Sequence, residues 1–352
     1  MYRVTFPESP IVYSIFGVQY VGDKPNENKQ ILIDTFDKLI HSSPAKKIEN
    51  LEEDTLSEGK SRIWLAYWIS ASSYESWWQT PDVVNLWATL PADAGMWREI
   101  LTVPKGRLQQ AVTQQTNEGL VSVGKDMVPY TDKTGYWGCY RDRYTDATPE
   151  NRMDSPLKTI PEAQASSLAI RPGRVRMAAL PDNLSFVVEG QDHSSVPQTE
   201  KDHWFENFDA PVTKWINHLT GPAGHDAGML KARVCYAPSS GQYRDALPKA
   251  LNYNRKIQLF YFLDHGYMER SGKKERGHVD LRTNFMKSYC PAGIMGQVGK
   301  LLLWVETCIL KGNEMECEYV GCWEGTGFLA YDQHKAFRSA DAAKSSKWFG
   351  IF

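Results

Sequence analysis

The sequence has few cysteines and none of the cysteine patterns that hold metals. No two cysteines form CxxC or CxxCH, which argues against a zinc ribbon, an iron–sulfur centre and covalent attachment of haem. We expect reduced, partly buried thiols. The six cysteines in the chain of 352 residues are Cys139, Cys235, Cys290, Cys308, Cys317 and Cys322.

An excess of charge and a long apolar run are also missing. Forty basic and 42 acidic residues give a net charge of −2, so neither nucleic acid nor an anionic membrane is an expected partner. No window reaches the roughly 18–20 apolar residues that a membrane helix needs. The N-terminus shows no secretory leader pattern. The sequence therefore predicts a soluble, cytoplasmic protein.

The common catalytic and phosphate-binding motifs are absent as well. The chain contains no GxGxxG after a strand, no GxxxxGK[ST], no HExxH and no GxSxG. Chemistry that depends on these motifs is mostly excluded. A bound cofactor that supplies the reactivity becomes the more favoured explanation.

Short apolar runs and helical periodicity are present along the whole chain. Five runs predict central strands that are buried on both faces, and two segments between them predict amphipathic helices. The predicted strands are residues 12–20, 63–70, 184–190, 257–263 and 301–310, and the helices are residues 29–40 and 81–90. We expect residues 271–277, SGKKERG, to be a solvated linker.

A weak internal repeat indicates duplication. The strand and helix in IWLAYWISASSYESWW resemble those in IQLFYFLDHGYMERS, in which Asp264 is a predicted N-cap. The repeat favours a duplicated α+β fold whose strands meet in a sheet or barrel. We expect one domain of two halves, roughly residues 10–135 and 136–330, followed by a C-terminal tail over residues 331–352.

One predicted helix, residues 278–289, carries a histidine in its first turn. His278, Arg282, Phe285 and Tyr289 share one stripe, with Leu281 adding to its apolar part. A haem requires such a wall, because burial provides most of its binding and one imidazole anchors the iron. A single histidine near a helix start is more often an ordinary surface or hydrogen-bonded residue, so the pattern alone leaves both interpretations open.

Three stretches then point to a known family. GYWGCYRDRY (135–144), NLSFVVEGQDH (183–193) and the block over residues 277–329 resemble the haem-containing aldoxime dehydratases, and the similarity runs through most of the chain. The resemblance implies a dimeric α+β fold of two ferredoxin-like units forming a barrel-like sheet core. It also implies a noncovalent b-type haem that is active as Fe(II), an aldoxime substrate and a nitrile product.

The resemblance assigns residues by position. It places the proximal haem ligand at His278 and the catalytic arginine of the family at Arg143, with Arg141 close by as an alternative. Where bacterial members have serine before Gly-Gln-Asp, this chain has Glu189. Where they have a distal histidine, it has Val305. Both differences are similar to those of a eukaryotic-type branch.

The missing distal histidine leaves the proton donor to be identified. Glu189 ends an apolar strand, and burial should raise its pKa enough to let it donate a proton to the departing hydroxyl. Arg143 would stabilise negative charge on the oxime oxygen. The alternative for Glu189 is a strand-end carboxylate in water or in a salt bridge. The alternative for Arg143 is a structural ion pair with Asp142 or Asp146, and His193 is a further candidate for the distal imidazole. Two other functions remain possible: a haem enzyme acting on another N–O or N–N substrate, and a haem carrier or sensor.

Overall fold

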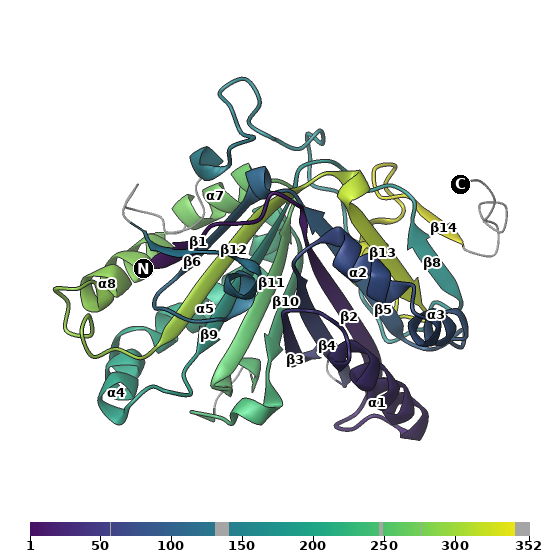
Figure 1. The fold of residues 1–352 in the computed structure, drawn as a ribbon, viewed down its shortest axis with the longest axis horizontal. Helices are drawn as coiled ribbons and strands as arrows, with labels where there is room; N and C mark the ends of the chain where they lie inside the picture. Colours follow the sequence, from purple (N-terminus) through teal and green to yellow (C-terminus); the bar gives the residue numbers. More distant parts are fainter. Residues whose placement is uncertain (57, 131–140, 246–248, 275, 342–352) are drawn as a thin grey trace.

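The structure is a computed structural model that describes residues 1–352 except 57, 131–140, 246–248, 275 and 342–352. A single antiparallel sheet of fourteen strands forms its centre, and helices cover the outer faces of the sheet (Figure 1). The strands are β1 Tyr2–Val4, β2 Ile11–Val21, β3 Lys47–Asp54, β4 Gly59–Trp68, β5 Met96–Val103, β6 Leu108–Val112, β7 Met127–Pro129, β8 Arg174–Met177, β9 Leu184–Asp192, β10 Met229–Tyr236, β11 Arg255–Phe262, β12 Leu302–Leu310, β13 Met315–Val320 and β14 Ser339–Asp341. The helices are α1 Glu27–His41, α2 Ala71–Trp78, α3 Pro81–Ala88, α4 Gln198–Asn207, α5 Asp209–Thr220, α6 Pro222–Asp226, α7 His265–Lys274 and α8 Arg276–Tyr289.

The sheet is built from two β-α-β-β-α-β units of the ferredoxin-like type. In the first unit, β2, β3, β4 and β5 lie in the order β5-β2-β4-β3, with α1 and α2–α3 as the two connections. In the second unit, β9, β10, β11 and β12 lie in the order β12-β9-β11-β10, with α4–α6 and α7–α8 as connections. The second strands of the two units, β3 and β10, pair with each other. The predicted α+β fold of duplicated ferredoxin-like units is therefore confirmed.

The two units also exchange strands. β6 follows the first unit in the chain but pairs with β12 of the second, whereas β13 follows the second unit and pairs with β5 of the first. This exchange crosses the expected boundary between residues 135 and 136, and the division into two halves stays a prediction. At the C-terminus the described residues differ from a plain tail, because β14 adds a strand beside β8.

Cross-strand pairs of glycine and tryptophan occupy the same position in each unit. Trp97 lies opposite Gly17, and Trp304 lies opposite Gly190. A Cβ added to either glycine would meet the indole at 2.3 Å in the first pair and 1.9 Å in the second. The absence of a glycine side chain therefore lets each indole lie over the neighbouring strand, and both indoles belong to the central core.

We expect Gly190→Ala to lower the free energy of unfolding by about 1–3 kcal/mol, because its methyl group would overlap Trp304. Gly17→Ala should behave alike. Gly277→Ala is the matched control: nothing lies within 4 Å of its added Cβ, and alanine favours the helix by up to about 1 kcal/mol. Urea unfolding measures all three variants, and equal stability of Gly190→Ala and the parent would contradict the expectation.

Two residues after each of these tryptophans, a buried glutamate links the units. Glu99 accepts hydrogen bonds from Arg233, at 2.8 and 3.0 Å, and from the Tyr261 hydroxyl at 3.0 Å. Glu306 accepts a hydrogen bond from the Tyr13 hydroxyl at 3.0 Å, and burial raises its pKa to about 8. Because Tyr261 belongs to the second unit and Tyr13 to the first, each carboxyl bonds across the centre of the molecule.

The outer faces of the two units are covered differently. Helices α1, α2 and α3 cover the first unit, and α4, α5, α7 and α8 cover the second (Figure 1). The helix predicted over residues 29–40 is α1, which starts at an Asn26 cap and buries one stripe of apolar residues. Large aromatic rings fill the space under the helices of the first unit: Phe16, Phe36, Trp64, Trp68, Trp77 and Trp87.

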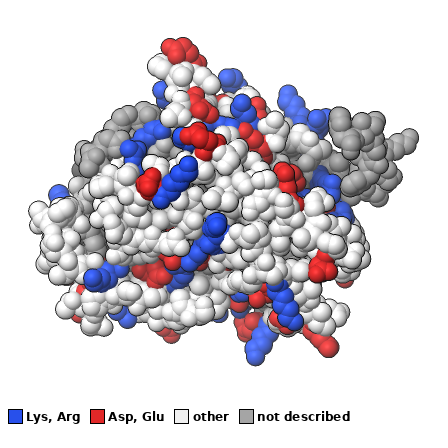
Figure 2. Space-filling view, viewed as in Figure 1, with Lys and Arg blue, Asp and Glu red and all other residues white. Residues whose placement is uncertain are grey.

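The surface and the thiols complete the description. On the face shown in Figure 2, basic and acidic side chains are interspersed. Among the described residues, no helix has both the length and the apolar character that crossing a membrane requires. The five cysteines that the structure describes form no disulfide, and four of them are buried.

Candidate functional site

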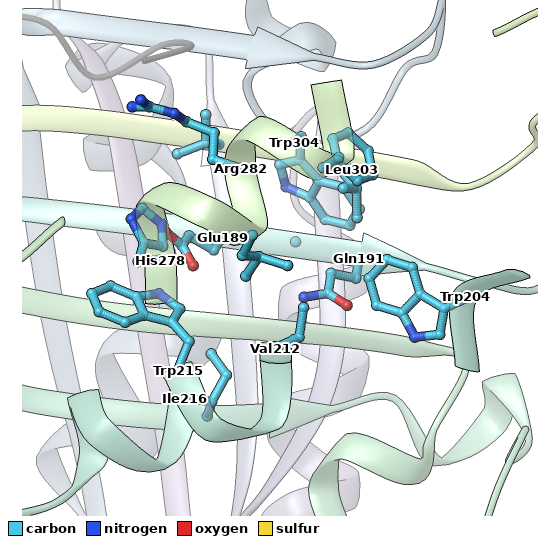
Figure 3. Close-up of a pocket in the computed structure, with 14 residues that line it drawn as sticks. Glu189, Gln191, Trp204, Val212, Trp215, Ile216, His278, Arg282, Leu303 and Trp304 are labelled. Carbon is cyan, nitrogen blue, oxygen red and sulfur yellow. The ribbon is translucent and has the colours of Figure 1, made fainter. Parts of the chain in front are cut away.

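A cavity lies under the helices of the second unit, where the first unit is filled by aromatic rings. It has about 780 Å³ of empty space, part of which is open to solvent. Strands β9 and β12 form its floor, and α4, α5 and α8 form its walls (Figure 3). Its lining residues are Glu189, Gly190, Gln191, Trp204, Val212, Trp215, Ile216, His278, Leu281, Arg282, Phe285, Leu303, Trp304 and Val305.

Two residues of the cavity floor, Glu189 and Val305, belong to one row across the sheet. Glu189 on β9 lies between Val305 on β12 and Gln258 on β11. The corresponding row of the first unit consists of Phe16 between Arg98 and Trp64. The same fold therefore places large side chains in the first unit where the second unit has Glu189 and Val305 beside a cavity.

His278 lines the cavity from the first turn of α8. This helix corresponds to the one that the sequence predicts over residues 278–289. The Nδ1 of His278 lies 3.1 Å from the carbonyl oxygen of Gly272, and its ring stacks on Trp215 with 4.2 Å between ring centroids. A carbonyl only accepts hydrogen bonds, so Nδ1 carries the proton and Nε2 has the lone pair of a neutral ring. Histidines that bind metals are commonly oriented by such a bond.

The surroundings of His278 favour its neutral form. Burial lowers its pKa, the Gly272 carbonyl acts in the opposite direction, and Arg282 lowers it further. A metal binds the neutral imidazole, so ligation needs no deprotonation at neutral pH. A neutral imidazole in this largely apolar wall could serve as a metal ligand.

The Gly272 carbonyl belongs to a segment whose structure differs from the one expected from the sequence. Residues 271–277 were expected to be a solvated linker, but α7 continues to Lys274 and α8 begins at Arg276. The two helices follow each other closely, which brings the Gly272 carbonyl to the imidazole of His278. Asp264 caps α7 as predicted, since its Oδ1 accepts a hydrogen bond from the backbone of Tyr267 at 2.8 Å.

Glu189 lines the same cavity as His278. Burial alone raises the pKa of its carboxyl to about 7, and no hydrogen bond to this carboxyl is found among the described residues. A carboxyl with this pKa holds its proton for about half of the time at neutral pH and can both give and take a proton. Val305, its cross-strand neighbour, is buried and presents an apolar surface to the same space.

Arg143 lies outside the lining of the cavity. It belongs to the 3₁₀ turn Arg141–Arg143, is buried, and holds its guanidinium 4.4 Å from the ring centroid of Tyr130. Tyr130 in turn packs against the apolar cluster that contains Val305, a residue of the cavity lining. Arg141 is engaged elsewhere, in an ion pair with Asp154 at 2.7 Å. Residues 135–140 of the GYWGCYRDRY stretch are outside the described residues.

His193 also lies beside the cavity and does not line it. Its ring stacks on Tyr243, with 4.6 Å between centroids, and its Nε2 lies 3.4 Å from the Oε1 of Gln191, which does line the cavity. Burial lowers the pKa of His193, and Lys256 lowers it further. The candidate distal imidazole is thus separated from the cavity by the Gln191 side chain.

Three residues of the site escaped sequence reasoning. Trp215 supports the ring of His278, and its helix shows the stripe of Val212, Trp215 and Ile216 that could have indicated a buried face. Gln258 borders Glu189 inside an apolar strand, where a lone glutamine was a visible signal. The contact of the Gly272 backbone has no sequence signal at all, since any residue supplies a carbonyl.

Comparisons with known proteins find similar sequences along most of the chain. Residues 14–328 match the family model described as haem-containing dehydratase. The phenylacetaldoxime dehydratase of Bacillus sp. (strain OxB-1) is 23% identical over 332 residues, covering 92% of this chain and 88% of that protein. The aliphatic aldoxime dehydratase of Rhodococcus globerulus is 24% identical over 334 residues, covering 91% and 86%.

Two solved structures share the fold. The structure of an aldoxime dehydratase in complex with butyraldoxime superposes with a TM-score of 0.72 at 17% identity, covering 93% of this chain and 88% of that chain. A second aldoxime dehydratase structure gives a TM-score of 0.71 at 19% identity, covering 93% and 90%. At these identities the likeness concerns the fold.

Proposed function

This chain belongs to the haem-containing dehydratase family, and on that premise we propose that it dehydrates aldoximes, R–CH=N–OH, to nitriles and water with the help of a bound haem. The observation that carries the proposal is the shared cavity of His278 and Glu189. One oriented neutral imidazole and one carboxyl able to hold a proton face the same largely apolar space.

The residues of the cavity fit a haem. Leu281, Phe285 and Val212 would offer apolar surface to a flat macrocycle, and the His278 imidazole would hold its iron. The chain has no CxxCH, so we propose a noncovalent b-type haem. A ferrous haem held there would supply an electron-rich iron that could weaken the N–O bond of the aldoxime.

In the proposed reaction, Glu189 carries out both proton transfers. Glu189 donates its proton to the oxygen of the N–O bond, so that water leaves instead of hydroxide. The resulting carboxylate takes the proton from the oxime carbon, and the carboxylic acid is restored. The sum is R–CH=N–OH to R–C≡N and H₂O, with no net proton gained or lost.

Arg143 is proposed to stabilise negative charge on the oxime oxygen while the N–O bond breaks. Support comes from its burial and from its stacking on Tyr130 beside the cluster of Val305. Because Val305 takes the position of a polar imidazole, the cavity favours an apolar R group, and we expect aliphatic or arylaliphatic aldoximes as substrates.

Three finer expectations from the sequence belong to this proposal. We expect a homodimer, a cytoplasmic location and no nucleic-acid partner. The homodimer is checked by measuring the mass of the haem-loaded protein in solution, and a monomeric mass at micromolar concentration would reject it.

The direct test is turnover under reducing conditions without oxygen. Haem-loaded protein, reduced with dithionite, should convert butyraldoxime or phenylacetaldoxime to the nitrile, with one water released per turnover. Gas chromatography of the products measures the conversion, and free haem with dithionite is the control. A haem-loaded protein that converts no aldoxime in a broad panel would overturn the lyase function and favour a carrier, a sensor or another N–O or N–N substrate.

A further inference from the structure

The buried amide of Gln258 has no hydrogen-bond partner among the described residues. Gln258 lies on β11 and is 0% exposed, and neither its Oε1 nor its Nε2 forms a hydrogen bond there. Unpaired buried polar groups destabilise a fold and are rare in native proteins. A residue of this kind therefore calls for a functional explanation.

The position of Gln258 beside Glu189 provides a functional explanation for its unpaired amide. It is the direct cross-strand neighbour of Glu189, so the two side chains stand on the same face with their Cβ atoms about 4.5–5.5 Å apart. The carboxyl of Glu189 also lacks a hydrogen bond among the described residues. An amide and a carboxyl at this spacing can pair after a change of side-chain torsions alone.

The fold itself does not demand a polar residue at this position. In the first unit, the place of Gln258 is taken by Trp64 and the place of Glu189 by Phe16, and both belong to the aromatic cluster under α1 and α2. Two apolar residues fill the same row without loss of the strand pairing. The polar pair of the second unit thus serves the cavity.

We propose that Gln258 is a positioning residue for Glu189: its Nε2 donates a hydrogen bond to one carboxyl oxygen and so leaves the other oxygen, with its proton, directed toward the cavity. This inference rests on the proposed function, in which Glu189 donates and then accepts a proton. When Glu189 has lost its proton, the same bond stabilises the carboxylate.

Other charged and titratable side chains around Glu189 also influence its pKa. From α8, His278 and Arg282 line the same cavity, and from β11 Lys256 lies one row away, with its Nζ donating to the Tyr243 hydroxyl at 2.9 Å. The residues that β12 and α5 contribute to the lining are uncharged. Substitution of Gln258 leaves all these groups in place.

Gln258→Leu in the haem-loaded protein is the test. We expect unchanged haem content, a fall in kcat of about tenfold and a KM within about twofold of the parent, because only the proton step is affected. The pH at which half of kcat is lost should move upward by about one unit, since the carboxylate loses a donor.

A second readout does not depend on turnover. The infrared C=O band of the protonated Glu189 carboxyl, assigned by its absence in Glu189→Gln, should disappear at a higher pH in Gln258→Leu than in the parent. If the parent converts no aldoxime, the proposed function fails, and the infrared titration still decides about Gln258. An unchanged titration and an unchanged kcat profile would overturn the inference.

Two further variants exclude a merely structural effect. Gln258→Asn keeps the amide on a shorter stem, so its titration should lie between those of the parent and the leucine variant, and it replaces Gln258→Leu if that variant fails to fold. Gln110→Leu is the matched control: Gln110 is buried, and its Oε1 accepts from the backbone of Val4 at 3.1 Å. It should lose stability and keep the titration of Glu189. A shift of equal size in Gln110→Leu would count against a specific role of Gln258.

Discussion

His278→Ala is expected to abolish the Soret absorption of the reconstituted protein, because it removes the one imidazole that faces the cavity from α8. Noncovalent haem depends on burial for most of its affinity, but without the His278 imidazole the iron would lose its protein ligand. We therefore expect a loss of bound haem of at least tenfold and no nitrile formation. Absorption spectra after gel filtration measure the haem that stays bound.

The control uses the second histidine that stacks on Trp215. His218 lies 5.6 Å from this ring, between centroids, and belongs to α5. His218→Ala should keep the Soret band, and imidazole added to His278→Gly should restore part of it. If His278→Ala retains haem with an unchanged spectrum, the ligand assignment is wrong.

Glu189→Gln is expected to lower kcat by about 10²–10⁴-fold with little change in haem content. The amide keeps the shape of the side chain and cannot supply the proton that water formation needs. In the parent protein, burial raises the pKa of Glu189 to about 7, so the protonated donor is present below this pH. Turnover should therefore fall as the pH rises through about 7, and the variant should lose this dependence.

The raised pKa of Glu189 also makes the free energy of unfolding depend on pH. A carboxyl whose pKa is raised by folding binds a proton in the folded chain that the unfolded chain has already released. The contribution of Glu189 to the free energy of unfolding should thus decrease as the pH rises from about 4.5 to about 7. Urea unfolding at several pH values, compared between the parent and Glu189→Gln, measures this slope.

Asp192→Asn is the control for these measurements. Asp192 ends the same strand but forms an ion pair with Arg255 at 2.8 Å and does not line the cavity. This variant should lose some stability while turnover per haem and its pH profile stay as in the parent. Equal loss of haem and turnover in Glu189→Gln would instead make Glu189 a structural residue.

Much of the fold was predictable because strand patterns and helix caps are local signals. The five apolar runs became β2, β4, β9, β11 and β12, and the faint repeat marked the third strand and the following helix of both units. A stronger repeat, Trp-x-Glu at Trp97 and Trp304, was overlooked. Strand exchange between the units was not predictable, since the partner of β6 or β13 depends on contacts far along the chain.

The site was predictable where side chains define it. Residue types and the family resemblance led to His278 and Glu189, which the structure brings to one cavity. Backbone groups and helix ends gave no such signal, so the Gly272 carbonyl was missed and residues 271–277 were interpreted wrongly. The roles of His278, Glu189 and Arg143 are all proposals, and the Arg143 guanidinium lies 4.4 Å from the Tyr130 ring centroid, outside the lining of the cavity.

The exchange of β6 and β13 also bears on synthesis at the ribosome. The outer edge of β5 stays without its neighbour until residues 315–320 have been translated and have left the exit tunnel. An unpaired apolar edge of this kind invites pairing with other nascent chains. The N-terminal unit therefore completes its folding only after β13 has been translated, and chaperones that shield strand edges should raise the yield of this protein.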